Sequence, residues 1–211
     1  MRRVSIAFGC MALGLLATGC KIARAPRPQR INTYLAEPGD LDSIRRIMVL
    51  PFSSEASTPA NCEGIRDAFL TELQKIRRFE VVPLPDTAQE SRELRESLRT
   101  GRLSAPAMVR LCNRYSLDGV FVGTVVSWRP YRPPHLGMRT YLFSVHSAEA
   151  VWAVDAMFDT NDLATISDLR DYTRRVLRDD GNLHGWELTL LSPSMFTKYV
   201  AHRFVTTWIA D

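Results

Sequence analysis

Apolar residues follow two different spacings in the first half of the chain. Short, almost continuous apolar runs at 47–52 and 79–84 predict strands that are covered on both faces. Between these runs, Ile65, Phe69 and Leu73 recur at helical spacing and predict a helix with one buried stripe. A strand, a helix and a second strand in this order predict a βαβ unit with parallel strands.

The second half of the chain predicts an antiparallel hairpin that follows a long strand. The segment 118–128 is rich in β-branched and aromatic residues, and its two glycines mark points where a neighbouring backbone comes close. A strand follows over 138–146, with Tyr141, Phe143 and Val145 on one face. A short link leads to a further strand whose buried face carries Trp152, Val154, Ala156 and Phe158.

Four further helices complete the predicted order of elements. A charged, exposed helix is expected over 87–98, and a second helix begins near Ser104 with Met108, Leu111 and Cys112 facing inward. A third runs from about Asp162 to Arg178 and a fourth begins near Pro193. The inward positions of the third helix are Leu169, Tyr172 and Val176. The order β-α-β-α-α-β-β-β-α-α predicts a single two-layer α/β sandwich, with helices packed on a mixed sheet.

The first 44 residues differ from the rest in composition. Two arginines precede an apolar run that ends in small residues at Cys20, which is the layout of an export signal with a cleavage point. Residues 21–44 contain three prolines and lack apolar periodicity, so they predict an extended segment. We therefore expect a signal peptide at 1–19, a basic, proline-containing tether at 20–44 and one α/β domain at 45–211.

The segment 16–20, Leu-Ala-Thr-Gly-Cys, resembles the lipobox of bacterial lipoproteins, although Ala17 stands where such boxes usually carry leucine. The resemblance implies that the leader is removed before Cys20 and that this cysteine carries the lipid, including palmitate. Lys21 follows it, rather than the aspartate that in enteric bacteria retains lipoproteins at the inner membrane. By resemblance, the expected location is the periplasmic face of the outer membrane. The inner membrane is the less favoured alternative.

The basic character of the chain lies almost entirely in its amino-terminal part. The chain has 27 basic and 23 acidic residues, but six of the basic residues and none of the acidic ones lie among the first 30. The folded part is therefore slightly acidic, which argues against nucleic acid as a partner. The basic tether either attracts anionic head groups or is an inert, solvated linker.

Two of the four cysteines remain for the folded part once Cys10 leaves with the leader and Cys20 carries lipid. In an oxidising compartment, Cys62 and Cys112 form a disulfide if their two predicted helices pack side by side. The alternative is that both are buried free thiols.

The segments "IMVLPF", "FEVVPL" and "DGVFVGTV" resemble a group of bacterial envelope proteins over roughly residues 45–158. The group includes the amino-terminal domain of the periplasmic Tol propeller protein, lipoprotein activators of penicillin-binding proteins and the curli secretion lipoprotein. The resemblance implies an α/β sandwich. It also implies a role in assembly with other envelope proteins, in activating a wall synthase or in forming a secretion pore.

Catalytic and metal-binding patterns are missing from the sequence. The four histidines are not paired at ligand spacing, and the stretch that starts at Asp159 lacks the glycine and the final glutamate of a calcium loop. Nucleophile and phosphate-binding motifs are also absent. We therefore expect no enzymatic activity, no metal and no cofactor.

One loop stands out as a candidate contact with a partner. Residues 129–135 carry three prolines that favour extended geometry, and Tyr131 and Arg132 are residue types enriched at the centre of protein interfaces. Tyr131, Arg132, Pro133 and Pro134 are thus expected to meet a protein partner, unless the loop is only a rigid connection between strands.

The function expected from the sequence is that of a non-catalytic, lipid-anchored envelope protein that binds other envelope proteins as a periplasmic adaptor or accessory subunit. Two alternatives remain open. One is an oligomeric secretion or pore-forming lipoprotein, and the other is an activator of a cell-wall synthase. Formation of a homo-oligomer is compatible with all three.

Overall fold

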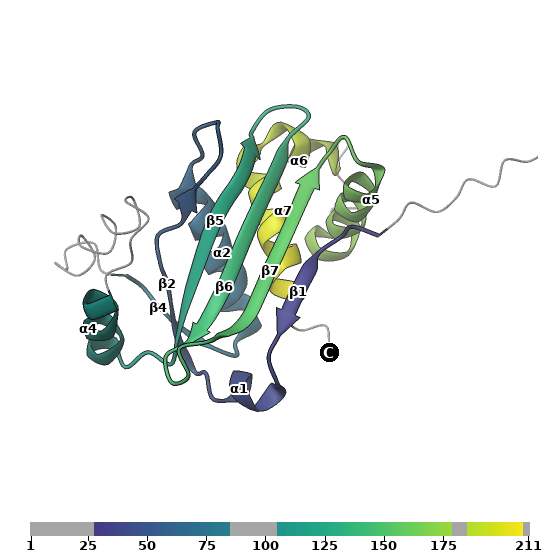
Figure 1. Ribbon diagram of the computed structural model, residues 1–211. Helices are drawn as coiled ribbons and strands as arrows, with labels where there is room; N and C mark the ends of the chain where they lie inside the picture. Colours follow the sequence, from purple (N-terminus) through teal and green to yellow (C-terminus); the bar gives the residue numbers. More distant parts are fainter. Residues whose placement is uncertain (1–27, 85–104, 179–184, 209–211) are drawn as a thin grey trace, which may run out of the picture.

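The computed structural model describes residues 28–84, 105–178 and 185–208 (Figure 1). Its strands are β1 (Asn32–Leu35), β2 (Arg46–Val49), β3 (Ser53–Ser54), β4 (Glu80–Val82), β5 (Gly119–Arg129), β6 (His135–Ser144) and β7 (Ala150–Asp159). Its helices are α1 (Pro38–Asp42), α2 (Cys62–Ile76), α4 (Ala105–Tyr115), α5 (Leu163–Tyr172), α6 (Glu187–Leu191) and α7 (Pro193–Thr206), with a π-helical turn, η1 (Thr173–Leu177), after α5.

The strands form one seven-stranded mixed sheet in the order β1-β7-β6-β5-β2-β4, with β3 beside β5. The βαβ prediction is confirmed, because β2 pairs in parallel with both β4 and β5. The hairpin is confirmed as well, because β6 pairs antiparallel with β7 over most of its length. The α/β class and the mixed sheet are therefore as the sequence predicts.

The main core lies between one face of the sheet and the helices α2 and α7. In Figure 1 both helices lie behind the strands, and they cross the sheet side by side. The Phe69 ring of α2 meets the Phe204 ring of α7 edge-on, with 5.5 Å between the ring centroids. The indole of Trp208 stacks on that of Trp152 from β7 at 4.9 Å. The terminal helix thus packs on the sheet of its own chain, and these large rings fill the space between the two layers.

The folded part of the chain begins earlier than the sequence indicates. Within the expected tether at 20–44, residues 32–35 form β1, which pairs antiparallel with the edge strand β7 from Asn32 opposite Asp155 to Leu35 opposite Trp152. The helix α1 follows it. β1 is short and mostly exposed, so it lacks the apolar pattern by which a strand is recognised.

The expected disulfide between Cys62 and Cys112 is not present, because both residues are free thiols. Cys62 begins α2 and packs against the core on one face of the sheet, whereas Cys112 of α4 is buried against the other face. The two predicted helices do not lie side by side, because the sheet separates them.

Other helical predictions are met in part. The helix expected over 87–98 lies outside the described residues. Leu169 and Tyr172 are buried as expected, but Val176 is 41% exposed because the chain leaves α-helical geometry after Tyr172 and forms η1. The predicted cap is confirmed, since the Asp162 carboxylate accepts a hydrogen bond from the amide of Ala164 at 3.0 Å.

Gly123 of β5 gives a sharp test of the packing between the layers. A Cβ atom at this position would lie 2.8 Å from three ring atoms of Phe52. That ring is held between Phe69 and Phe121, with centroids at 5.4 and 6.1 Å, so it has little room to move. The close approach expected from the glycine is therefore made by a side chain.

Gly123→Ala is expected to lower the free energy of unfolding by about 1–3 kcal/mol, the usual cost of overpacking a core. Urea unfolding followed by tryptophan fluorescence measures this loss. Gly39→Ala is the matched control, because nothing lies within 4 Å of a Cβ at that position, and it should cause no loss. Equal stability of the two variants would contradict the packing described here.

Candidate functional site

The face of the sheet opposite α2 and α7 carries exposed aromatic side chains. Tyr141 and Phe143 of β6 both point to this face, and their rings stack with centroids 5.8 Å apart. Through the strand register, Tyr141 has Val122 of β5 on one side and Ala153 of β7 on the other, and Ala153 in turn lies beside Tyr34 of β1. A row of apolar and aromatic side chains therefore crosses four strands.

This face is only partly covered by the described residues. The helix α4 packs there through Leu111 and Cys112, which contact Met48, Leu50 and Val82 in a second, smaller core over β2 and β4. Figure 1 shows α4 at the side of the sheet and shows β5, β6 and β7 without a helix in front of them. Tyr34 is 55% exposed and Phe143 is 37% exposed, although Leu142 and Ser144, on either side of Phe143 in β6, are buried.

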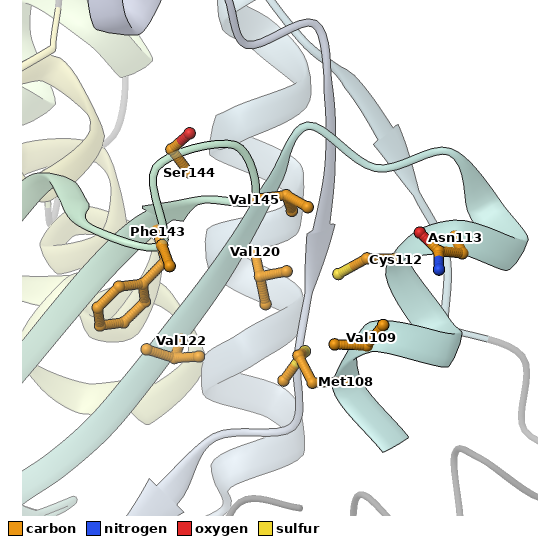
Figure 2. Close-up of a pocket in the computed structure, with 10 residues that line it drawn as sticks. Met108, Val109, Cys112, Asn113, Val120, Val122, Phe143, Ser144 and Val145 are labelled. Atoms are coloured by element: carbon orange, nitrogen blue, oxygen red, sulfur yellow. The ribbon is translucent and has the colours of Figure 1, made fainter. Parts of the chain in front are cut away.

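An apolar groove lies where α4 ends and this uncovered face begins. Its volume is about 560 Å³, and Figure 2 shows Met108 and Cys112 directed from α4 toward Val120 on β5. The lining comes from α4, β5, β6 and the β6–β7 turn: Met108, Val109, Cys112, Asn113, Val120, Val122, Phe143, Ser144, Val145 and Ala148. We call this groove, together with Tyr34 and Tyr141, the aromatic face.

The chemistry of the aromatic face is that of a contact surface. Its polar side chains in the groove are neutral, Asn113 and Ser144. Burial raises the pKa of the Cys112 thiol, which keeps the sulfur protonated and unreactive at neutral pH. The groove therefore favours apolar and aromatic contacts. One row further along the same face, Arg139 of β6 lies beside Asp155 of β7, so charged side chains border the aromatic row.

The loop predicted to contact a partner lies elsewhere. Tyr131 is 74% exposed, and Arg132 and Pro133 are also exposed, whereas Pro134 is buried. The loop joins the end of β5 to the start of β6, and the Pro134 carbonyl accepts a hydrogen bond from Thr160 Oγ1 at 2.9 Å. The groove is at the opposite end of the same two strands, so the structure does not bring the loop and the groove together.

A buried charged cluster between α2 and α7 could not be seen in the sequence. Glu72 is buried, and its carboxylate accepts hydrogen bonds from Lys75 and from His202 Nδ1, the latter at 3.1 Å. Burial alone would raise the pKa of the Glu72 carboxyl, but these hydrogen bonds outweigh it and the pKa is lowered. Burial and the Glu72 charge raise the pKa of the adjacent Tyr172 to about 12.

A second polar group joins α5 to α7. The Tyr199 hydroxyl donates to Asp168 Oδ2 at 2.7 Å, and Arg203 Nε lies 2.9 Å from the same oxygen. Burial, with the Asp168 charge, raises the pKa of Tyr199. These groups hold the helices together, because each charged member has an opposite charge beside it.

One serine and one histidine meet on the sheet in a way that resembles a catalytic pair. Ser127 Oγ lies 2.6 Å from His135 Nε2, and burial, together with the Arg129 charge, lowers the pKa of His135. A catalytic histidine also needs a third group that orients its other nitrogen. The nearby Asp159 Oδ1 instead accepts from the Asn161 amide at 2.9 Å and lies 3.5 Å from Arg129. Ser127 and His135 join β5 to β6 through this hydrogen bond, and the charge of Asp159 partly offsets the lowering of the His135 pKa.

No cluster of three or more histidine, cysteine, aspartate or glutamate side chains in residues 28–84, 105–178 and 185–208 is arranged to hold a metal ion. Within the same ranges, no helix has the length and apolar character needed to cross a bilayer.

No family model matches the chain, and no curated protein matches it in sequence. The solved structures that are similar to it include the PelC dodecamer from Paraburkholderia phytofirmans, at 13% identity and a TM-score of 0.44, covering 65% of this chain and 93% of PelC. Another is lipoprotein GNA1162 from Neisseria meningitidis, at 15% identity and a TM-score of 0.39. The match covers 56% of this chain and 85% of GNA1162. A third is the carboxy-terminal domain of LpoB from Escherichia coli, at 12% identity and a TM-score of 0.38. The match covers 54% of this chain and 81% of the LpoB domain. At such identities and TM-scores, no function is taken from them.

Glu72→Gln is expected to lower the free energy of unfolding at pH 7 by about 1–3 kcal/mol, because charge-assisted hydrogen bonds to a buried group are lost. The folded-state pKa of Glu72 lies below its ordinary value of 4.5. The stabilisation is therefore present above that pH and is lost as the pH falls through the folded-state pKa.

Urea unfolding at pH 7 and at successively lower pH checks this prediction. The difference between wild type and Glu72→Gln should shrink on acidification, whereas Glu149→Gln, in the exposed β6–β7 turn, should differ from wild type by less than about 0.5 kcal/mol throughout. A difference that does not change with pH would contradict the role assigned to the Glu72 charge.

Proposed function

We propose that this chain is a non-catalytic, lipid-anchored protein of the bacterial envelope that binds another envelope protein through its aromatic face. The observation that carries the proposal is the exposed aromatic row on one side of the sheet. Buried aromatic side chains contribute strongly to interfaces because each covers a large apolar area. A partner that covers Tyr34, Tyr141 and Phe143 would therefore gain affinity from the apolar area that it buries.

The shape of the aromatic face favours a helix of the partner. α4 already occupies the sheet over β2 and β4. Neighbouring strands lie about 4.8 Å apart, so the strip from β5 to β7 is about 10 Å wide. This is the usual distance between two packed helices and the diameter of one. We propose that the partner lays one amphipathic helix beside α4, with its apolar side on Val122, Tyr141 and Phe143.

The anchor is proposed from the sequence. A leader at 1–19 would be removed, and Cys20 would carry the acyl chains, with palmitate among them. Lys21 in the second position favours the outer membrane, with the domain in the periplasm. The basic residues that follow would add attraction to anionic head groups, since one acyl chain alone binds only marginally.

The two alternatives differ in what covers the aromatic face. In an oligomeric secretion or pore-forming lipoprotein, a second copy of this chain would cover it. In an activator of a wall synthase, the partner would be that enzyme. The mass of the detergent-solubilised protein separates the first alternative from the proposal, because a ring of many subunits would refute the adaptor function.

Cys20→Ser should abolish the incorporation of labelled palmitate and should move the protein from the membrane fraction to the soluble fraction. The reason is that the serine hydroxyl cannot replace the thioether that carries the lipid. Cys62→Ser serves as the matched control and should leave both readouts unchanged. Palmitate labelling that persists in Cys20→Ser would rule out the proposed anchor.

Val109→Asp should weaken partner binding by at least about tenfold, because it places a charge on the rim of an apolar contact. Val109 is 58% exposed, so the variant should fold with an unchanged unfolding midpoint. A photo-crosslinking amino acid in place of Phe143 provides the measurement in intact cells. It should give one discrete product that Val109→Asp removes.

The same amino acid in place of Lys198, which is exposed on α7 in the other layer, should give no such product. Crosslinking at both positions alike, or a Phe143 product that Val109→Asp leaves at full intensity, would count against the aromatic face as the binding surface. A product made of two copies of this chain would favour the oligomeric alternative.

A further inference from the structure

The chain enters the fold at one defined end of the sheet. The side chain of Gln29 donates from Nε2 to the Met157 carbonyl of β7 at 2.7 Å, and its Oε1 accepts from Thr165 Oγ1 of α5 at 2.8 Å. Gln29 is thus fastened both to the last residues of β7 and to the first turn of α5. The described chain therefore leaves the domain from this end.

The distance from this end to the proposed lipid is short. Pro28 lies eight positions after Cys20, and a fully extended chain spans about 3.4 Å per residue, so the two residues are at most about 27 Å apart. This step rests on the proposed anchor at Cys20. If that anchor forms, the end of the domain that holds Gln29 lies next to the bilayer.

Large apolar side chains are exposed at the same end. Leu163 at the start of α5 is 75% exposed, Tyr131 in the β5–β6 loop is 74% exposed, and Leu191 at the end of α6 is 60% exposed. Figure 1 shows the β5–β6 loop, α6 and the start of α5 together at one end of the strands. We call Gln29, Arg30, Tyr131, Arg132, Leu163 and Leu191 the tether end.

Two surface hollows connect these residues. One, of about 340 Å³, is bounded by Arg132, Thr160 and Leu190, and the other, of about 750 Å³, is bounded by Gln29, Asp159 and Leu163. Their linings come from neighbouring positions of the chain, Thr160 in the first hollow and Asp159 and Asp162 in the second. Leu163 lines the second hollow, and the sequence neighbours of Tyr131 and Leu191, Arg132 and Leu190, line the first.

We infer that the tether end rests on the lipid surface. Tyrosine is enriched at the level of the head groups, and leucine side chains are stabilised by about 0.8 kcal/mol for each CH₂ group they bury in the acyl region. The tether carries Lys21, Arg24 and Arg27, and Arg30 and Arg132 extend this positive charge onto the domain. Anionic head groups attract such residues by about 1 kcal/mol each.

The main carboxylates at this end are already engaged by the protein. Asp162 caps α5 through the Ala164 amide, and Asp159 lies beside Arg129 at 3.5 Å. Glu187 lies in the first turn of α6, where the helix dipole favours a negative charge. Asp162 and Glu187 keep their negative charge and offset part of this attraction, so the net attraction to an anionic surface comes mainly from Lys21, Arg24 and Arg27 of the tether.

This orientation places the groove of the aromatic face at the end of the strands that points away from the membrane. β7 begins beside the β6–β7 turn and ends at the tether end, and its ten residues span about 30 Å. The groove is near the β6–β7 turn and would face the periplasm, where a protein partner can reach it. The sequence predicts that Tyr131 and Arg132 contact a protein partner. In this orientation they contact lipid instead.

The test uses the full acylated chain in vesicles of phosphatidylethanolamine and phosphatidylglycerol. A fluorescent amino acid replaces Tyr131 or Leu163 at the tether end, or Ser147 in the exposed β6–β7 turn as the matched control. Lipids with a spin label on the head group quench a fluorophore that touches them. The quenching should be at least about twofold stronger at positions 131 and 163 than at 147, and it should weaken at high salt because the tether charges are screened.

Flotation with the vesicles distinguishes a missing lipid anchor from a missing contact between the tether end and the lipid. A wild-type chain that does not float with the vesicles would refute the anchor and, with it, the contact. A chain that floats, but whose fluorophores at 131 and 163 are quenched no more than the one at 147, would refute the lipid contact and leave the anchor intact. A photo-crosslinker at 131 that joins a protein, with no quenching there, would show that the loop binds a protein.

Discussion

The packing of α2 and α7 against one face of the sheet is the constraint on which the rest of the structure depends. The rings of Phe69, Phe204 and Trp208 fill the space between these helices and the strands, and Trp152 of β7 completes the contact. Because both long helices lie on this face, the other face is left to α4. Among the described residues, α4 covers the part over β2, β4 and the start of β5. The exposed aromatic row is therefore a direct result of how the helices are distributed.

Buried charge in this domain supports the fold. Glu72 with His202, and Asp168 with Tyr199, lie in the layer of helices and join α2, α5 and α7 to one another. The aromatic face carries neutral polar groups at its groove, and the tether end combines apolar and basic side chains. A division of this kind, with one end suited to lipid and the far face to a protein partner, fits a module held at a membrane.

Most of the fold could be predicted from local patterns. The alternation in β7 assigned Trp152, Val154, Ala156 and Phe158 to a buried face, and all four are buried. β1 was missed because its residues are exposed and polar, so that pairing with β7 alone defines it. The pair Glu72 and His202, and the separation of Cys62 from Cys112 by the sheet, depend on long-range packing that no local spacing records.

In the sequence, the apolar residues of the aromatic face are compatible with two arrangements. Leu142 is apolar on one side of β6, and Tyr141 and Phe143 are apolar on the other. Such a strand is expected to be covered on both faces, either by its own chain or by another. Which of these applies depends on where the helices pack. Composition identified the loop with Tyr131 as a candidate contact. It did not predict that the loop lies at the same end of the domain as Gln29, where the chain enters the fold.

The most direct test of the central claim is the solvent accessibility of Tyr34, Tyr141 and Phe143, measured by hydroxyl-radical footprinting. The three side chains should be modified readily in the purified protein and protected in native membranes, where the partner is present. Tyr131 reports on the other end of the domain in the same experiment. Equal modification of the aromatic face in both preparations, or protection already in the purified protein, would contradict the claim that this face is an open binding surface.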